Sequence, residues 1–237
     1  MVFLTETGTL SRLFAIGDIH GCFSALQTLL QDVPLTPQDQ VVTLGDYVDR
    51  GPESRQVVEW LISEAKTDQF IPLRGNHEIM MLDALRGRMP MHHWLQFGGR
   101  DALQSYARPG TYGTPEDIPV EHLRFLDREL RPYYETESHL FVHAGMHPLL
   151  SPPDQNDEWL FWERFDSLSA HASGKTIICG HTAQKSGLPQ NRGYAICIDT
   201  WAYGQGWLTC LDVGSGQYWQ ANQRGESRSD WLPEPAA

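Results

Sequence analysis

The stretch that most constrains this chain is the turn at residues 44–51, which reads Leu-Gly-Asp-Tyr-Val-Asp-Arg-Gly. An apolar run leads into it and predicts a buried strand that stops at Gly45. Beyond Gly45, the turn carries the carboxylates of Asp46 and Asp49 and the guanidinium of Arg50. Because a strand end is a rigid platform, we expect these charged groups to form part of a site.

Two further apolar runs end in polar turns of the same kind. These are residues 17–21 (Gly-Asp-Ile-His-Gly) after the run 13–16, and residues 74–78 (Arg-Gly-Asn-His-Glu) after the run 70–73. Asp18 and Asp46 are 28 residues apart, and Asp46 and Asn76 are 30 apart, which fits one strand-helix-strand crossover each. Right-handed crossovers make such strands parallel, with their carboxyl ends at one edge of the sheet. We therefore expect the three turns to meet in space.

The rest of the chain divides into a helical and a β-rich part. Residues 88–118 are rich in Gly and Pro and predict a helical insertion with a loop beside the site. A helix is expected at 119–130. Strands are expected at 133–137, 140–142 and 176–179, and then as successive antiparallel strands at 194–198, 206–211 and 217–220. We expect one domain over residues 1–237, with its core at about 11–222 and a loose tail at 223–237.

Composition narrows the possible partners. A formal charge of −12 without a lysine and arginine cluster argues against nucleic acid or an anionic membrane as partner. Residues 1–12 lack a signal-peptide pattern and no apolar run reaches membrane-spanning length, so we expect a cytoplasmic protein, and a monomer. The four cysteines form no C-x-x-C pair, and we expect reduced thiols. They are Cys22, Cys179, Cys197 and Cys210.

Six side chains with oxygen or nitrogen donors follow apolar runs and are candidate metal ligands. They are Asp18, His20, Asp46, Asn76, His143 and His181. Asp18 and His20 are two apart in an extended segment, so both can point the same way. Carboxylate, amide and imidazole donors without a thiolate suit manganese, iron or zinc. Each feature alone has a plainer reading: a capping aspartate at residue 18, a surface ion pair at Asp49 and Arg50, or a core histidine at residue 143.

The combined pattern resembles the phosphoprotein phosphatase family of metallophosphoesterases. The blocks 17–21, 45–51 and 74–78 look like its three signature motifs, and Val-His-Ala-Gly (142–145) and Gly-His-Thr (180–182) look like its two later histidine motifs. The resemblance runs in the right order from about residue 13 to 211. It implies an α/β, calcineurin-like fold: a four-layer α/β/β/α sandwich of two mixed sheets, with the helical insertion beside the site.

The resemblance also implies a role for each site residue. Two divalent ions, manganese first and iron or zinc as alternatives, would share Asp46 and a hydroxide that attacks phosphorus directly. One ion would be held by Asp18, His20 and Asp46, and the other by Asp46, Asn76, His143 and His181. His77 would protonate the leaving group and Asp49 would orient its ring. The phosphate would be bound by Arg50 and Arg164, with Arg74 adding positive field.

The function implied is hydrolysis of phosphoserine and phosphothreonine, with phosphotyrosine and small phosphoesters as further substrates. The alternative is a symmetrical bis(5'-nucleosyl)-tetraphosphatase, whose motifs lack the acidic residue found here as Asp49 and carry Leu in place of Arg74. A scaffold without turnover would lack His77, Asp49 or Arg50. One departure is Trp201, where bacterial phosphatases of the family usually carry Gly. Trp94, Tyr106 and Tyr203 are read as core residues or, alternatively, as a substrate wall.

Overall fold

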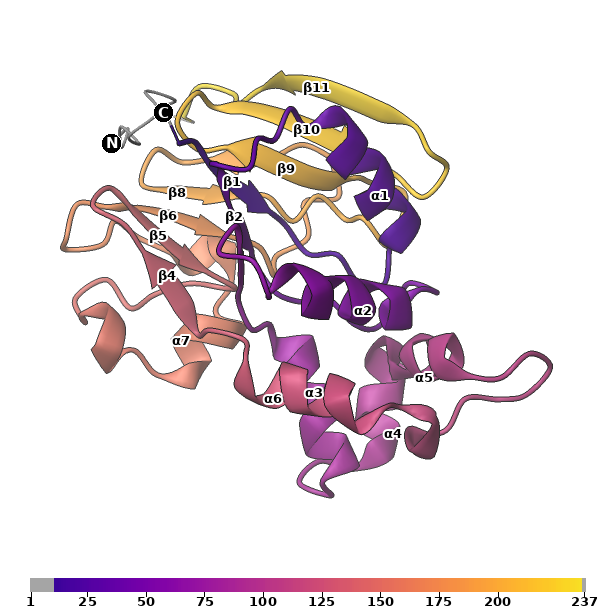
Figure 1. Cartoon of the computed structure of the whole chain (residues 1–237). Coiled ribbons are helices and arrows are strands. Elements are labelled where there is room, and N and C mark those ends of the chain that lie inside the picture. The colour runs from indigo at the N-terminus through magenta and orange to yellow at the C-terminus, as the bar shows by residue number, and fades with distance from the viewer. Residues whose placement is uncertain (1–10, 236–237) are drawn as a thin grey trace.

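Two β-sheets face each other in the computed structural model, which describes residues 11–235 (Figure 1). The signal-segment prediction therefore falls mainly on residues outside the described range. Among residues 11–235, none of the helices combines the length and the apolar character needed to cross a bilayer.

The first sheet has six strands in the order β11-β10-β9-β1-β2-β3. Its parallel half confirms the three predicted strands, because β1 pairs in parallel with β2, and β2 with β3. These strands are β1 (Leu13–Ile16), β2 (Gln40–Thr43) and β3 (Phe70–Pro72). Each is followed by a helix, as the crossover spacing predicts: α1 (Phe23–Asp32), α2 (Ser54–Glu64) and α3 (Asn76–Leu85). The antiparallel half consists of β9 (Leu208–Asp212), β10 (Gln217–Ala221) and β11 (Ser227–Trp231).

The second sheet has five strands in the order β4-β5-β6-β8-β7. They are β4 (Tyr133–Glu135), β5 (His139–Val142), β6 (Thr176–Cys179), β7 (Gln190–Asn191) and β8 (Ala195–Cys197). β5, β6 and β8 are parallel, so their carboxyl ends share an edge as those of β1 to β3 do. The helix α7 (Asp157–Trp162) packs on the outer face of this sheet, where Leu160 and Phe161 join its core.

Successive side chains along each strand point to opposite faces of its sheet. They therefore divide the buried residues into three clusters, which lie between four layers. In β1, Phe14 and Ile16 pack under the helices, while Ala15 between them faces the second sheet. In β5, Phe141 meets that inner layer, while its neighbours Leu140 and Val142 pack under α7. The α/β/β/α sandwich with two mixed sheets expected from the sequence is confirmed.

The predicted insertion forms a small helical layer beyond α2 and α3. It contains α4 (Met91–Trp94), the kinked turn η1 (Leu95–Gly99), where Gly98 leaves the helical conformation, α5 (Arg100–Tyr106) and the 3₁₀ turn η2 (Pro115–Asp117). The helix α6 (Val120–Arg128) follows and lies beside α3 (Figure 1). Short 3₁₀ turns at Pro152–Asp154 and Phe165–Ser167 flank α7.

Two predictions about the last third of the chain are wrong. β8 is not antiparallel to the strands that follow it but lies in the second sheet, parallel to β6. The expected loose tail contains β11, which pairs with β10 over five residues. All five residues of β11 are exposed. An exposed polar edge strand shows no apolar alternation, so hydrophobic periodicity could not reveal it.

Candidate metal centre

The backbone of the turn after β2 is fixed by the carboxylate of Glu78, to which the sequence assigned no role. Glu78, fully buried at the start of α3, accepts hydrogen bonds from the backbone N–H groups of Asp46 (3.0 Å), Tyr47 (2.8 Å) and Gly75 (2.9 Å). It stands at the third position of α3, and its bond to the N–H of Gly75 is the glutamate half of a helix capping box; glycine has no side chain for the other half. Burial, with Asp46 nearby, raises the pKa of Glu78 to about 8. Glu78 thus fixes the backbone on which Asp46 stands.

Asp46 lies at the centre of the site and presents each carboxylate oxygen to a different histidine. Its Oδ2 is 3.4 Å from His20 Nε2, and its Oδ1 is 3.4 Å from His143 Nε2. Its backbone adopts a φ of +52°, a left-handed conformation that few residues other than glycine adopt. Two groups of converging donors share it: His20, Asp46 and His77, and Asp46, His143 and His181. A carboxylate shared in this way can bridge two cations, but the first group contains His77 where Asp18 was predicted, and Asp18 belongs to neither group.

The histidines are oriented as neutral ligands. His20 Nδ1 lies 3.0 Å from the carbonyl of Val48, and His143 Nδ1 lies 2.9 Å from that of Leu44. A carbonyl only accepts, so each Nδ1 carries the proton and each Nε2 is an acceptor on the side of Asp46; that of His20 accepts from the Arg50 guanidinium at 2.7 Å. Burial lowers the pKa of His20 well below its usual value and that of His143 to about 3. Both rings are therefore uncharged at neutral pH.

Acceptor atoms converge on Asn76 without a donor among them. Its Oδ1 lies 3.0 Å from His143 Nε2 and 3.3 Å from His181 Nδ1, and 3.2 Å from both oxygens of Asp46. An inverted amide could donate only two hydrogens to these four acceptors, whereas a cation between them satisfies all of them. Asp46, Asn76, His143 and His181 thus lie together, and their oxygen and imidazole nitrogen donors fit a divalent metal ion.

Asp18 follows β1 of the first sheet and lies against the backbone of the turn that follows β6 of the second sheet. Its carboxylate accepts the N–H of His181 at 3.0 Å and packs against Gly180, where any Cβ would collide with it. Burial, with Asp199 and Asp46 nearby, raises the pKa of Asp18 well above its usual value. Asp199, to which the sequence assigned no role in the site, is also buried, and its Oδ2 has no hydrogen-bond partner among residues 11–235. Three buried carboxylates this close together favour a cation between them.

A second group of side chains links the insertion to the site. His77 Nδ1 lies 2.6 Å from Asp49 Oδ2. The indole N–H of Trp94, buried in α4, donates to both oxygens of Asp49 at 3.0 Å. Burial lowers the pKa of His77 to about 4. Trp94 and Tyr106 are therefore core residues and do not form a substrate wall; the indole N–H of Trp94 also supports Asp49, and Tyr106 lies against His122.

The predicted phosphate-binding arginines occupy three different settings. Arg50 points into the site, with one guanidinium nitrogen 2.7 Å from His20 Nε2 and its Cζ 4.4 Å from the centroid of the Tyr203 ring. Arg164 is 70% exposed and faces Asp166 at 4.0 Å. Arg74 is not brought to the site: it donates to the carbonyl of Asp127 at the end of α6. The backbone N–H of Arg74 donates to the carbonyl of Arg131.

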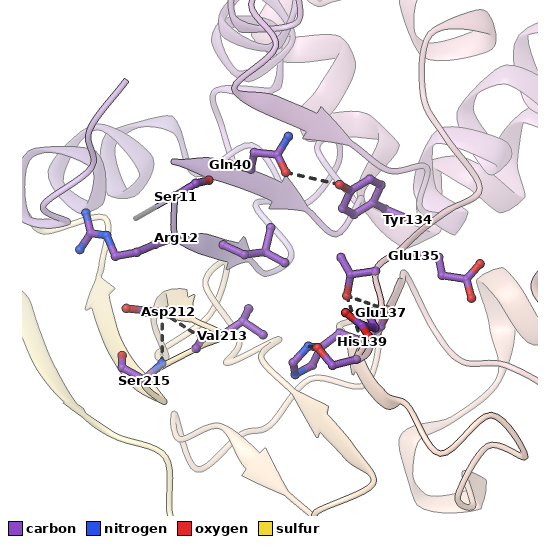
Figure 2. Close-up of a pocket in the computed structure, with 14 residues that line it drawn as sticks. Ser11, Arg12, Gln40, Tyr134, Glu135, Glu137, His139, Asp212, Val213 and Ser215 are labelled. Carbon is purple, nitrogen blue, oxygen red and sulfur yellow. Dashed lines mark hydrogen bonds between the residues drawn. The ribbon is translucent and has the colours of Figure 1, made fainter. Parts of the chain in front are cut away.

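A cavity of about 570 Å³ lies at the opposite edge of the sandwich (Figure 2). It is lined by the starts of β1 and β2, by the β4–β5 hairpin and by the β9–β10 turn, including Arg12, Tyr134 and Asp212. It contains none of the candidate ligands. The site is thus defined by converging side chains at the carboxyl ends of the parallel strands and not by this cavity.

This architecture and donor set define a class. The sequence profile of the calcineurin-like phosphoesterases matches residues 11–214, and the chain belongs to that family. Among solved structures, one provisionally assigned as a diadenosine tetraphosphatase superposes with a TM-score of 0.64 at 22% identity, over 94% of both chains. The cold-active protein-tyrosine phosphatase of a psychrophilic Shewanella species gives 0.59 at 18% identity, over 92% of this chain and 80% of that one. Identities this low support the fold alone.

Two groups of curated relatives match. The symmetrical bis(5'-nucleosyl)-tetraphosphatase of Acidovorax sp. is 35% identical over 139 residues, which cover 57% of this chain and 44% of that protein. Serine/threonine-protein phosphatase 1 of Salmonella typhimurium is 42% identical over 89 residues, or 37% of this chain and 39% of that protein. The matched part thus spans less than half of either relative.

Proposed function

We propose that this chain is a metal-dependent hydrolase of phosphomonoesters, acting on phosphorylated serine, threonine or tyrosine side chains or on small phosphoesters. When bound, two divalent cations supply an activated water and neutralise charge on the phosphoryl oxygens. Asp18, His20 and Asp46 would hold one cation, and Asp46, Asn76, His143 and His181 the other. Manganese is the first ion to test, because these donors include no thiolate.

The observation that carries the proposal is the chain of contacts from Trp94 through Asp49 to His77. Asp49 holds the ring proton at Nδ1, so Nε2 is free to face the substrate. A phosphate dianion bound at Arg50 raises the pKa of His77, because nearby negative charge favours the imidazolium. His77 then donates a proton to the departing oxygen. An alkoxide needs that proton more than the phosphate leaving group of an anhydride does.

Symmetrical cleavage of a dinucleoside tetraphosphate is the second candidate. Relatives with that name recur among the curated matches, and taken together the comparisons support this reading better than the phosphatase one. The donors around Asp46 suit either reaction. The two candidates differ in the leaving group and therefore in their need for His77.

A side-by-side assay with manganese separates the two candidates. A phosphopeptide, an aryl phosphate and a dinucleoside tetraphosphate are compared by kcat/KM, each with a chelator control. We expect hydrolysis of both monoesters, faster than that of the tetraphosphate and abolished by the chelator. Cleavage of the tetraphosphate alone would replace this proposal by the second candidate.

A further inference from the structure

The loop that follows β8 carries a tryptophan in a backbone conformation that favours glycine. Trp201 has a φ of +66°. A bulky residue in the left-handed region is strained and persists only where its surroundings fix it. Such an outlier beside a reactive centre motivates a functional hypothesis for the side chain.

Hydrogen bonds fix this loop on both sides of Trp201. Its carbonyl accepts the N–H groups of Gly204 (3.1 Å) and Gly206 (3.2 Å), and its own N–H donates to Asp199 at 3.1 Å. Gly204 lies directly against the indole, where an added Cβ would meet the ring at 2.2 Å. The position of the indole is therefore set by the loop.

Two aromatic rings from this loop extend outward from the phosphate-binding arginine. The ring of Tyr203 lies 4.4 Å from the Arg50 guanidinium and stands edge-to-face with His20 at 4.9 Å. Trp201 continues the row, edge-to-face with Tyr203 at 6.4 Å, and Lys185 lies 5.8 Å from its ring. Both rings are partly exposed. We call this pair, Trp201 and Tyr203, the aromatic wall.

We propose that the aromatic wall selects phosphomonoesters whose leaving group is a flat ring, such as phosphotyrosine, over alkyl esters such as phosphothreonine. This inference rests on the proposed function and narrows its substrate class. With the phosphate at Arg50, the group attached to it leaves beside Tyr203 and Trp201. A ring in that position packs edge-to-face or offset-stacked on the wall, whereas an alkyl chain gains no such contact.

The test compares kcat/KM for two peptides of identical sequence that carry phosphotyrosine or phosphothreonine. Trp201→Gly removes the indole and suits the backbone at that position, so the fold is expected to be kept. We expect the phosphotyrosine to phosphothreonine ratio to fall roughly 2- to 13-fold, the value of one aromatic pair. Trp201→Phe should restore most of it.

Trp207→Leu is the matched control, because Trp207 belongs to the same loop but packs on Arg228. An equal fall of the ratio in this variant would overturn the proposal, because the effect would then come from loop packing. An unchanged ratio in Trp201→Gly would also overturn the proposal, even if this variant had lost cleavage of a dinucleoside tetraphosphate.

A binding measurement separates this inference from the proposed function. Calorimetric titration of the manganese-loaded protein with phenylphosphonate and methylphosphonate needs no turnover. We expect tighter binding of the phenyl compound, and loss of that preference in Trp201→Gly. If phenylphosphonate binds more tightly but no monoester is hydrolysed, the proposed function is wrong while the proposed role of the aromatic wall is supported. If both phosphonates bind equally, the proposed role of the aromatic wall is wrong, whether or not monoesters are hydrolysed.

Discussion

At the scale of single residues, the site depends on side chains whose charge state is set by burial. His20, His77 and His143 are all nearly or fully buried, and each has a lowered pKa. Their protons are held on the ring nitrogen that faces away from Asp46, by a carbonyl or by Asp49. A neutral ring is the state that a cation requires of the candidate ligands His20 and His143.

Replacing the proposed acid should have an effect that depends on the leaving group. We expect His77→Asn to slow hydrolysis of an alkyl phosphate by roughly 10²- to 10⁴-fold, as for loss of a general acid, and of an aryl phosphate much less. Steady-state kinetics on both substrates, with metal content measured in parallel, checks this. His122→Asn removes another buried imidazole, outside the site, and should leave both rates unchanged. An equal loss on both substrates would show that His77 acts in another way.

Burial of His143 predicts a pH dependence of stability. The pKa of His143 is about 3 in the folded protein, below its usual value, so between about pH 3 and 6.5 the unfolded chain binds the extra proton. The stability of the metal-free protein relative to a His143→Gln variant should therefore fall as pH falls, by up to about 1.4 kcal/mol per unit. Urea unfolding of both proteins in chelator from pH 7 to 4 measures this difference. A constant difference would contradict it.

At the scale of elements, the insertion is part of the site. The carbonyl of Gly98 in η1 accepts the backbone N–H of Arg50 at 3.2 Å. Gly98 has a φ of +111°, and an added Cβ would lie 2.5 Å from the Arg50 nitrogen. Together with the bond from Trp94 to Asp49, this contact makes the insertion a support for two of the residues that the strand turns supply.

Gly98→Ala should therefore displace Arg50. We expect kcat/KM for a phosphomonoester to fall roughly 10- to 100-fold, as for a misplaced binding group, with a higher KM. The matched control is Gly110→Ala in the same insertion, because Gly110 also has a positive φ but open space around it. Kinetics and a melting curve for both variants test the expectation. A similar fall in both would mean that the insertion acts only through stability.

The sequence predicted the elements whose signal is local. Apolar runs and polar turns located β1, β2 and β3, and the crossover spacing placed their turns together. The sequence did not predict the bond from Trp94 to Asp49, because these two residues are 45 positions apart. The role of Glu78 was not predicted either, because the sequence alone does not distinguish a buried capping glutamate from an exposed glutamate in a helix. The sheet to which β8 belongs depends on packing across the sandwich, and no local pattern encodes that.

At the scale of the whole molecule, the site lies where the two sheets meet. His20, Asp46 and Asn76 follow strands of the first sheet, whereas His143 and His181 follow β5 and β6 of the second. A cation held by both sets would tie the sheets together. Its binding energy would then add to the folding free energy.

Metal removal should therefore lower thermal stability. We expect manganese at 100 times its dissociation constant to stabilise the protein by about 2.7 kcal/mol per site, and a chelator to abolish this. Differential scanning calorimetry with and without the ion measures the shift. Asp46→Asn should lose most of the shift, while Asp83→Asn, a control on the outer side of α3, should keep it. An unchanged response in Asp46→Asn would argue against a bridging carboxylate.

The strand β11 also has a consequence for the edge of the first sheet. β10, with Tyr218 and Trp219, would otherwise end the first sheet with a row of unpaired backbone groups, which invites aggregation by strand addition. β11 covers that row and presents exposed Arg228 and Asp230 in its place. A chain shortened after Asn222 would keep every residue of the metal centre and yet expose the backbone of β10 to pairing with other strands.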